Sequence, residues 1–213
     1  GINIAIDGPA GAGKSTIAKK VAKELSFIYV DTGAMYRAMA FYLLEKGISG
    51  DENISKACHD ADISIRYENG EQQVILNGKN VTAFLRKEEV GNMASVSSAN
   101  PEVRAHLLKL QRNLAAENNV VMDGRDIGTT ILPNAEVKIF LTASAKTRAN
   151  RRYLELTEKG EACDMDEILK DIIDRDERDM SRAVSPLKQA EDAVRVDAFG
   201  KGDKLLIGNI VLI

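Results

Sequence analysis

A glycine-rich stretch near the start of the chain limits what this sequence can fold into more than any other feature. Residues 8–15 read Gly-Pro-Ala-Gly-Ala-Gly-Lys-Ser, a complete match to the pattern G-x-x-x-x-G-K-[ST]. A short apolar, β-branched run over residues 2–7 precedes the match, and a helical pattern from about Lys14 to Leu25 follows it. Because the motif requires this strand–loop–helix context, a chance glycine-rich turn is a poor explanation. The sequence therefore predicts a loop that binds the phosphates of a nucleoside triphosphate.

Each residue type in this phosphate-binding loop has a physical task. The glycines allow backbone N–H groups to turn inward, and the start of the following helix adds the positive end of its dipole. We expect Lys14 to reach the β- and γ-phosphates and Ser15 to bind Mg²⁺ through its hydroxyl. The complete set expected to bind ATP is Gly8, Pro9, Ala10, Gly11, Ala12, Gly13, Lys14, Ser15 and Thr16. The loop by itself does not identify the reaction.

Strands and helices alternate along most of the remaining chain, which predicts an α/β fold with a doubly wound parallel sheet. The expected elements are a strand at 27–30, a helix at 35–45, helices at about 88–96 and 101–116, strands at 120–122 and 137–141, and a densely charged helical stretch at 144–180. Between about Asp62 and Leu76 the pattern changes to alternation around Asn69-Gly70, which predicts a β-hairpin. We therefore expect a single domain over residues 1–213 that carries a small β-containing insert at about 60–90.

The composition argues against several other classes of protein. A net charge of -3 and a pI of about 5.6 disfavour a nucleic-acid-binding surface and leave room only for a local basic pocket. Cys58 and Cys163 lie in no paired or metal-binding spacing, so we expect free thiols in a reducing compartment. No run of about eighteen apolar residues and no signal-peptide pattern is present. We expect a cytoplasmic protein without a membrane or nucleic-acid partner.

A GTPase would carry the same loop, but the rest of its signature is missing or misplaced. No N-K-x-D motif for guanine occurs. The strings Ser144-Ala145-Lys146 and Asp197-Ala198-Phe199-Gly200 resemble two further GTPase motifs, but they follow one another in the reverse order. A kinase of a small acceptor needs instead a second anion site with several arginines, because both of its substrates are polyanions.

Residues 31–37, Asp-Thr-Gly-Ala-Met-Tyr-Arg, are the first candidate for such a site, directly after the second predicted strand. Asp31 or Thr32 fits the cap of the following helix. Arg37, one turn in, is then placed to hold an acceptor phosphate together with free N–H groups. An ordinary helix cap with a surface arginine explains the same residues equally well, and the sequence leaves both interpretations open.

Residues 122–129, Met-Asp-Gly-Arg-Asp-Ile-Gly-Thr, are the second candidate and follow a predicted buried strand. Ligands of parallel sheets gather at the carboxyl ends of the strands. Asp123 stands where a carboxylate would hold Mg²⁺, directly or through water. Arg125 and Asp126 place opposite charges side by side, as a phosphate contact and a base contact would. The position at a strand end favours a functional site over an ordinary charged loop.

The charged helical stretch supplies the third candidate. Arg175, Arg178 and Arg182 recur at i, i+3 and i+7 and share one helix face, with Asp179 beside them. Acidic residues four positions before two of the arginines make an exposed, ion-paired helix an adequate alternative. Given the phosphate-binding loop upstream, we favour a mobile lid over about residues 150–185 that closes on the phosphates and excludes water.

Together these strings resemble bacterial cytidylate kinases. The match follows the order and spacing of the family nearly up to Val196, over residues 8–15, 31–37, 93–104, 122–129 and 175–187. The strings D-T-G-A-M-Y-R and D-G-R-D-I-G-T are far more specific than the phosphate-binding loop. The resemblance implies Mg²⁺-dependent transfer of the γ-phosphoryl group of ATP to CMP or dCMP by a monomer. It also implies a core, an acceptor-binding insert and a helical lid.

The resemblance further implies roles for single residues. Ser95, Arg104 and Asp126 would read cytosine: a carboxylate accepts from the amino group, whereas the O4 atom of uracil would face it as a second acceptor. The implied acceptor site comprises Asp31, Thr32, Arg37, Ser95, Arg104, Arg125, Asp126, Arg175, Asp179 and Arg182. The implied catalytic residues are Lys14, Arg125, Arg178 and Arg182, and the metal ligands are Ser15 and Asp123. Without the resemblance, Ser95 would pass for helix filler and Arg104 for a surface residue.

The end of the chain departs from the family, which continues with a D-T-T turn and an amphipathic helix. Here Asp197-Ala198-Phe199-Gly200 and an apolar, β-branched tail at 205–213 predict no regular helix. Two alternatives to a cytidylate kinase remain. A kinase of UMP or AMP would have no use for the set Ser95, Arg104 and Asp126. A nucleotide-binding protein without phosphoryl transfer would give Arg37, Arg125 and Arg182 no shared task.

Overall fold

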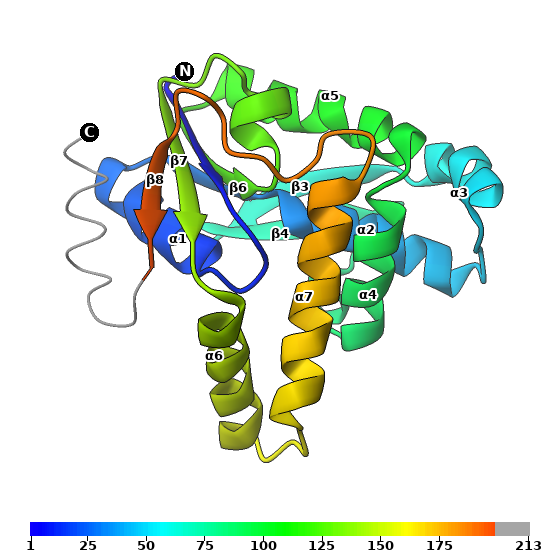
Figure 1. The fold of residues 1–213 in the computed structure, drawn as a ribbon. Helices are drawn as coiled ribbons and strands as arrows, with labels where there is room; N and C mark the ends of the chain where they lie inside the picture. Colours follow the sequence, from blue (N-terminus) through cyan, green and yellow to red (C-terminus); the bar gives the residue numbers. More distant parts are fainter. Residues whose placement is uncertain (199–213) are drawn as a thin grey trace.

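Five parallel strands form the central sheet of the structure, a computed structural model that describes residues 1–198. Their order is β2-β6-β1-β7-β8, and every neighbouring pair is parallel. The strands are β1 (Asn3–Asp7), β2 (Ile28–Asp31), β6 (Val120–Gly124), β7 (Val137–Thr142) and β8 (Val194–Asp197). The predicted α/β class with a parallel sheet is confirmed, and Figure 1 shows the arrowheads of β7 and β8 pointing toward the helices α6 and α7.

Helices cover both faces of this sheet. Successive strand residues point to opposite sides, so each face carries apolar side chains that pack against helices. Ile6 of β1 packs in one cluster with Val21 of α1, whereas Ala5 belongs to the opposite cluster with Met39 of α2 and Leu107 of α5. The helices are α1 (Lys14–Leu25), α2 (Thr32–Glu45), α3 (Asp51–Ala57), α4 (Glu88–Ser97), α5 (Pro101–Glu117), α6 (Ala145–Glu158) and α7 (Met165–Ser181), with the short turns η1 (Cys58–Asp60), η2 (Thr82–Phe84) and η3 (Ile127–Ile131). The carboxyl ends of the strands therefore form an edge between two helical layers.

The predicted hairpin is present. Strands β3 (Ile63–Glu68) and β4 (Glu71–Leu76) pair antiparallel around Asn69 and Gly70, whose φ angles of 54° and 78° suit this tight turn. A further strand, β5 (Lys79–Asn80), extends the hairpin to a small sheet of order β3-β4-β5. The hydroxyl of Tyr67 donates to the carbonyl oxygen of Tyr29 at 2.9 Å, which fastens this sheet beside β2.

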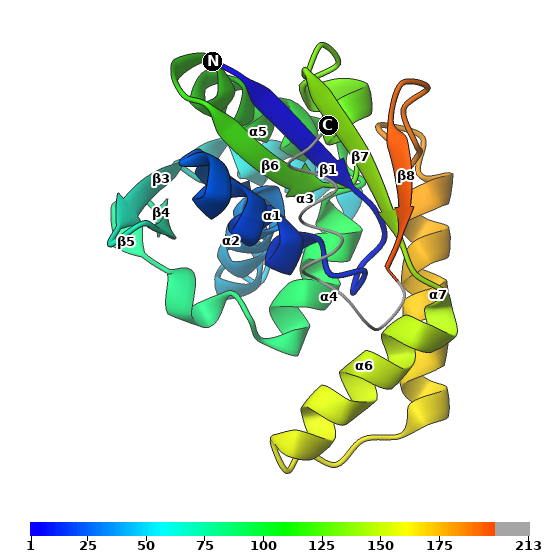
Figure 2. The ribbon, with the colours of Figure 1, turned by 90° about the vertical axis from the view of Figure 1, so that its left-hand side faces the viewer.

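Several element boundaries differ from the sequence-based expectation. Helix α2 begins at Thr32, immediately after β2, and α3 was not expected. The charged stretch at 144–180 is two helices: the chain turns at Gly160 (φ 72°), and Asp164 caps α7 by accepting from the Glu167 N–H. Figures 1 and 2 show α6 and α7 side by side and projecting from the end of the sheet. We call this pair the helical arm.

Three further expectations concern the thiols, a membrane-spanning helix and the C-terminal tail. Cys58 and Cys163 are free cysteines, as expected. Within residues 1–198, no helix has the length and apolar character needed to cross a membrane. The prediction that 205–213 form no helix lies outside the described residues.

Candidate functional site

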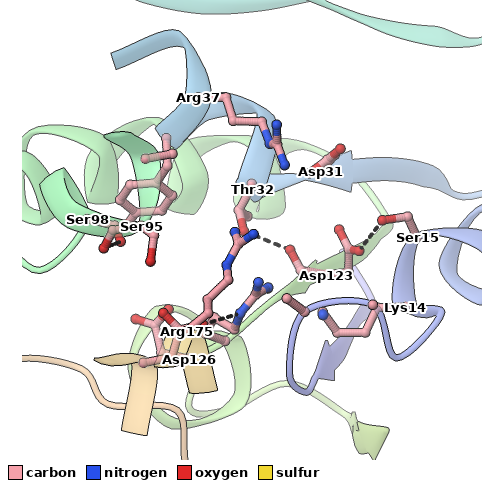
Figure 3. A pocket seen from close by; sticks show the side chains of 18 of the residues that line it. Lys14, Ser15, Asp31, Thr32, Arg37, Ser95, Ser98, Asp123, Asp126 and Arg175 are labelled. Atoms are coloured by element: carbon pink, nitrogen blue, oxygen red, sulfur yellow. Dashed lines mark hydrogen bonds and ion pairs between the residues drawn. The ribbon is translucent and has the colours of Figure 1, made fainter. Parts of the chain in front are cut away.

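A pocket opens at the carboxyl edge of the central sheet, between the phosphate-binding loop, α2, α4 and α7 (Figure 3). It is lined by Ala10, Gly11, Lys14, Ser15, Asp31, Thr32, Gly33, Tyr36, Arg37, Arg86, Ala94, Ser95, Ser98, Arg104, Asp123, Gly124, Arg125, Asp126, Arg175, Asp179 and Arg182. Most of the residues predicted for ATP, acceptor and metal thus meet in one cavity. Those predicted residues that do not line it are Gly8, Pro9, Ala12, Gly13, Thr16 and Arg178.

The phosphate-binding loop is held tightly against the sheet. A side chain at Gly8 would overlap the carbonyl oxygen of Leu141 on β7, and Gly13 enters α1 with a φ of 91° that other residues adopt only with strain. Lys14 is 6% exposed, and its Nζ donates to the Pro9 carbonyl oxygen at 2.8 Å. Burial, together with the nearby Arg125, lowers the pKa of Lys14. A bound anion would therefore stabilise the charged form of the Lys14 ammonium group.

Asp123 at the end of β6 faces this loop. Its two carboxylate oxygens accept from Ser15 Oγ at 3.0 Å and from the Tyr29 hydroxyl at 3.2 Å. Burial, and secondarily the charge of Asp31, raises the pKa of Asp123. Among residues 1–198 no cluster of three His, Cys, Asp or Glu side chains could hold a metal. Ser15 and Asp123 are nevertheless suitable ligands for Mg²⁺, which takes few protein ligands and completes its coordination shell with water and substrate phosphates.

The sequence left open whether Asp31 or Thr32 caps helix α2, and the structure decides this. Asp31 is the capping residue and accepts from the Ala34 N–H at 3.0 Å. Thr32 instead donates its hydroxyl to the Asp123 carbonyl oxygen at 2.7 Å, which ties α2 to β6. Gln72 of the small sheet forms two hydrogen bonds with the backbone of Asp31. Its side chain accepts from the Asp31 N–H at 2.9 Å and donates to the Asp31 carbonyl oxygen at 3.1 Å. Sequence reasoning missed Gln72, because a polar residue in a half-exposed strand carries no signal.

Arg37 projects from the first turns of α2 into the pocket rather than into solvent. Its Nη1 donates to the Leu85 carbonyl oxygen at 2.9 Å. Burial is the main cause that lowers the pKa of Arg37, and Arg86 adds to it. The alternative of an ordinary surface arginine is therefore wrong, although what Arg37 binds stays a prediction.

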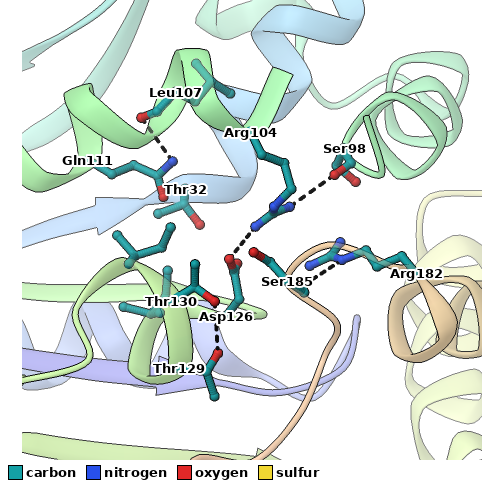
Figure 4. Close-up of polar contacts among 12 residues, drawn as sticks. Thr32, Ser98, Arg104, Leu107, Gln111, Asp126, Thr129, Thr130, Arg182 and Ser185 are labelled. Atoms are coloured by element: carbon teal, nitrogen blue, oxygen red, sulfur yellow. Dashed lines mark hydrogen bonds and ion pairs between the residues drawn. The ribbon is translucent and has the colours of Figure 1, made fainter. Parts of the chain in front are cut away.

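Arg104 and Asp126 form a buried ion pair at the inner end of the pocket (Figure 4). Their side chains are only 6% and 5% exposed. Arg104 also donates to the Ser98 carbonyl oxygen at 3.1 Å, and its guanidinium carbon lies 5.1 Å from the ring centre of Tyr36. The interpretation of Arg104 as a surface residue, which the sequence favours without the resemblance, is wrong. A buried ion pair that lines a pocket suits recognition of a polar planar group.

Asp7, a residue that sequence reasoning did not single out, holds the loop that carries Arg125 and Asp126 by hydrogen bonds to its backbone. Both carboxylate oxygens of Asp7, at the end of β1, accept backbone hydrogen bonds, from Ile127 N at 2.8 Å and from Gly128 N at 2.7 Å. Burial raises the pKa of Asp7 to about 6, against the lowering effect of these two hydrogen bonds. Because Asp7 directly precedes the phosphate-binding loop, it links that loop to the loop that carries Arg125 and Asp126.

Helix α7 brings the third predicted group to the pocket, with one exception. Arg125 Nε donates to Asp179 at 3.0 Å, and Arg182 Nε donates to the Ser185 carbonyl oxygen at 2.7 Å. Arg178 is exposed, and its Nε donates to Ser95 Oγ at 3.4 Å. The alternative of an exposed helix with i, i+4 ion pairs does not account for these arginines, because Arg175 and Arg182 line the pocket and Arg178 contacts Ser95 of α4.

Cations outnumber carboxylates in this pocket, seven to four, although the whole chain carries a net charge of -3. Burial, followed by the charge of Arg125, lowers the pKa of Arg175 to about 10. Within the described residues, Arg175 Nε and Arg182 Nη2 are buried without a hydrogen-bond partner. Unpaired buried donors and crowded cations are both costly, and a bound polyanion would satisfy both.

Comparisons with known proteins agree with this geometry. The family model described as cytidylate kinase matches residues 4–211. A cytidylate kinase from Carboxydothermus hydrogenoformans is 51% identical over 201 residues, covering 93% of this chain and 90% of that protein. A cytidylate kinase from Bacillus cytotoxicus is 46% identical, covering 100% of this chain and 95% of that protein. A solved structure of an uncharacterized protein from Eubacterium ventriosum shares the fold at a TM-score of 0.50, with 14% identity and coverage of 98% and 97%. The chain belongs to the cytidylate kinase family and is a nucleoside monophosphate kinase.

Proposed function

We propose that this enzyme transfers the γ-phosphoryl group of ATP to CMP and to dCMP, with Mg²⁺. One observation carries the proposal: a single pocket joins the phosphate-binding loop to the buried Arg104–Asp126 pair. Cations line the space between them. The pocket therefore suits a triphosphate at one end and a polar base at the other, with two phosphate groups meeting in the middle.

At the donor end, Lys14 and the N–H groups of the loop hold the phosphates of ATP. Ser15 and Asp123 would hold Mg²⁺, which would supply positive charge to balance the phosphates. The raised pKa of Asp123 supports this role, because a carboxylate buried near Asp31 is costly without a neighbouring cation.

At the acceptor end, Arg37, Arg125 and Arg182 hold the monophosphate. The attacking atom is a phosphate oxygen that is already ionised near neutral pH, so no strong general base is needed. Catalysis then comes from in-line positioning and from charge balance by Lys14 and the arginines as the phosphoryl group moves. Arg178 would join this group when residues 150–185 close as a lid, and residues 60–90 would enclose the acceptor.

Asp126, Arg104 and Ser95 select the base. The carboxylate accepts from the amino group of cytosine, and the guanidinium donates to N3 and O2. Arg175 and Asp179 hold the sugar. Contacts to the sugar atoms that CMP and dCMP share would serve both acceptors.

Product identification tests this proposal. Incubation with ATP, Mg²⁺ and CMP or dCMP should yield equimolar ADP and CDP or dCDP, and chelation of Mg²⁺ should stop the reaction. ADP formation without a phosphorylated acceptor would indicate hydrolysis. Tight ATP binding with no product at all would favour a binding protein. A sedimentation measurement in the same buffer would test the proposed monomer.

A further inference from the structure

Side chains on one stretch of α7 connect this helix to three other parts of the molecule. Arg178 reaches Ser95 of α4, and Asp179 accepts from Arg125 in the loop after β6 at 3.0 Å. Both contacts lead to the acceptor end of the pocket. The third contact, made by Asp176, leads to the other end, where the phosphate-binding loop lies.

The partner of Asp176 is Arg148, on the neighbouring helix α6, and only 4% of the Arg148 side chain is exposed. Its two terminal nitrogens form a bidentate pair with the carboxylate of Asp176, at 3.0 Å for Nη1. Nη1 also donates to the carbonyl oxygen of Ala10 in the phosphate-binding loop at 3.0 Å, and Nε donates to that of Ala143 after β7 at 2.9 Å. A single guanidinium therefore joins the loop, the end of the sheet and α7.

The chemistry of this junction is suited to fixing a position. A guanidinium is planar and presents its donors in a rigid fork, so a bidentate pair restricts both distance and angle. A buried pair of this kind is costly unless its remaining donors are also satisfied, and here each nitrogen has an acceptor. Neither Arg148 nor Asp176 lines the pocket. Their effect on substrates must therefore pass through other residues.

We propose that Arg148 and Asp176 are positioning residues that set the place of α7 relative to the phosphate-binding loop. Asp176 stands between Arg175 and Asp179 on α7, and both of these line the pocket. The pair thereby aligns the acceptor with the donor phosphates. This inference rests on the proposed function, since it assigns Arg175 and Asp179 to the acceptor.

A second pair on α6 provides a matched control. Arg152 and Glu155 lie 3.1 Å apart, but their side chains are 46% and 50% exposed, and the contact joins residues of the same helix. Glu155→Gln removes an arginine–carboxylate contact from the arm without touching α7 or the phosphate-binding loop. It should leave all substrate constants unchanged.

The test uses the full chain with Asp176→Asn, Arg148→Lys, the double variant and Glu155→Gln. Asp176→Asn retains the Arg148 contacts to Ala10 and Ala143, so the Kd for ATP should stay within about twofold while the KM for CMP rises about ten- to a hundredfold. Arg148→Lys should raise both the Kd for ATP and the KM for CMP. The double variant should be no worse than Arg148→Lys, because two residues that act as one unit are not additive.

Two results would overturn the proposal. One is a lowered Tm in Asp176→Asn with an unchanged KM for CMP, which would make the pair a purely structural contact. The other is additive losses in the double variant. If Arg148→Lys fails to fold, Asp176→Asn alone decides between these outcomes.

Hydrogen exchange separates this inference from the proposed function, because it needs no turnover. Amide protection in α7 should fall in Asp176→Asn and persist in Glu155→Gln, and equal protection in both would contradict the pairing. If the unaltered enzyme does not turn over CMP, the proposed function fails, whatever the exchange result.

Discussion

Replacement of Asp126 by Asn is the perturbation that most sharply tests how the base is selected. The two side chains have nearly the same shape, so the buried space beside Arg104 is retained. The change replaces a carboxylate that only accepts with an amide that can turn either an acceptor or a donor toward the base. Cytosine loses a hydrogen bond to a charged group, whereas uracil loses a repulsive contact between two acceptors.

The magnitude follows from burial. With 5% of the Asp126 side chain exposed, little water screens the contact, and a hydrogen bond to a charged group contributes about 1.5–3 kcal/mol. The kcat/KM for CMP should therefore fall about ten- to 150-fold, since about 1.36 kcal/mol corresponds to a factor of ten. The kcat/KM for UMP should stay level or rise, so the ratio of kcat/KM for CMP to that for UMP should fall by at least the same factor.

A coupled ADP-release assay with CMP and UMP at fixed ATP and Mg²⁺ measures this ratio. Asp171→Asn, an exposed change of the same type on α7, serves as the control and should leave the ratio unchanged. An equal loss for CMP and UMP in Asp126→Asn would refute the base-reading role. That result would point to general damage from leaving Arg104 without its counter-charge.

Three further predictions concern the metal, the acceptor phosphate and the pH dependence of stability. Ser15→Ala should raise the Mg²⁺ concentration for half-maximal rate by about tenfold, a shift read from a Mg²⁺ titration at saturating ATP. Gly91→Ala should stabilise α4 by up to about 1 kcal/mol in urea unfolding while raising the KM for CMP, because its Cβ would lie 3.2 Å from Arg37 Nη1; an unchanged KM would mean that Arg37 does not hold the acceptor. Burial raises the pKa of Asp7 from 3.8 to about 6, so within this window the folded protein keeps a proton that the unfolded chain has released. The contribution of Asp7 therefore makes the unfolding free energy of the ligand-free protein fall as pH rises from about 4 to 6, and urea midpoints across that range should fall less steeply in Asp7→Asn.

Much of the fold was predictable because local signals agree with tertiary structure. The bounds of α1 follow from the glycine-rich loop before it and the end of its apolar face, and the Asn69-Gly70 turn fixed the hairpin. The break between α6 and α7 was missed because Lys, Glu and Asp are compatible both with a helix and with its ends. Only the positive φ of Gly160 and the cap by Asp164 mark it.

The candidate site was predictable where short strings specify it and not where the fold assembles it. Residues 31–37 and 122–129 lie at adjacent strand ends, so the parallel order alone brings them together. Asp7, Gln72 and Arg148 act through contacts between residues 41 to 138 positions apart, for which a single sequence gives no pattern. Burial likewise distinguishes Arg104 from the many arginines that are simply solvated.

The most direct measurement of the central claim is the set of kcat/KM values for CMP, dCMP, UMP and AMP with ATP and Mg²⁺. Selection by Asp126, Arg104 and Ser95 predicts that CMP and dCMP exceed UMP by about a hundredfold or more, since a site built for the amino group leaves its polar atoms unpaired with uracil. Equal or greater values for UMP or AMP would contradict the assignment of the Arg104–Asp126 pair to cytosine.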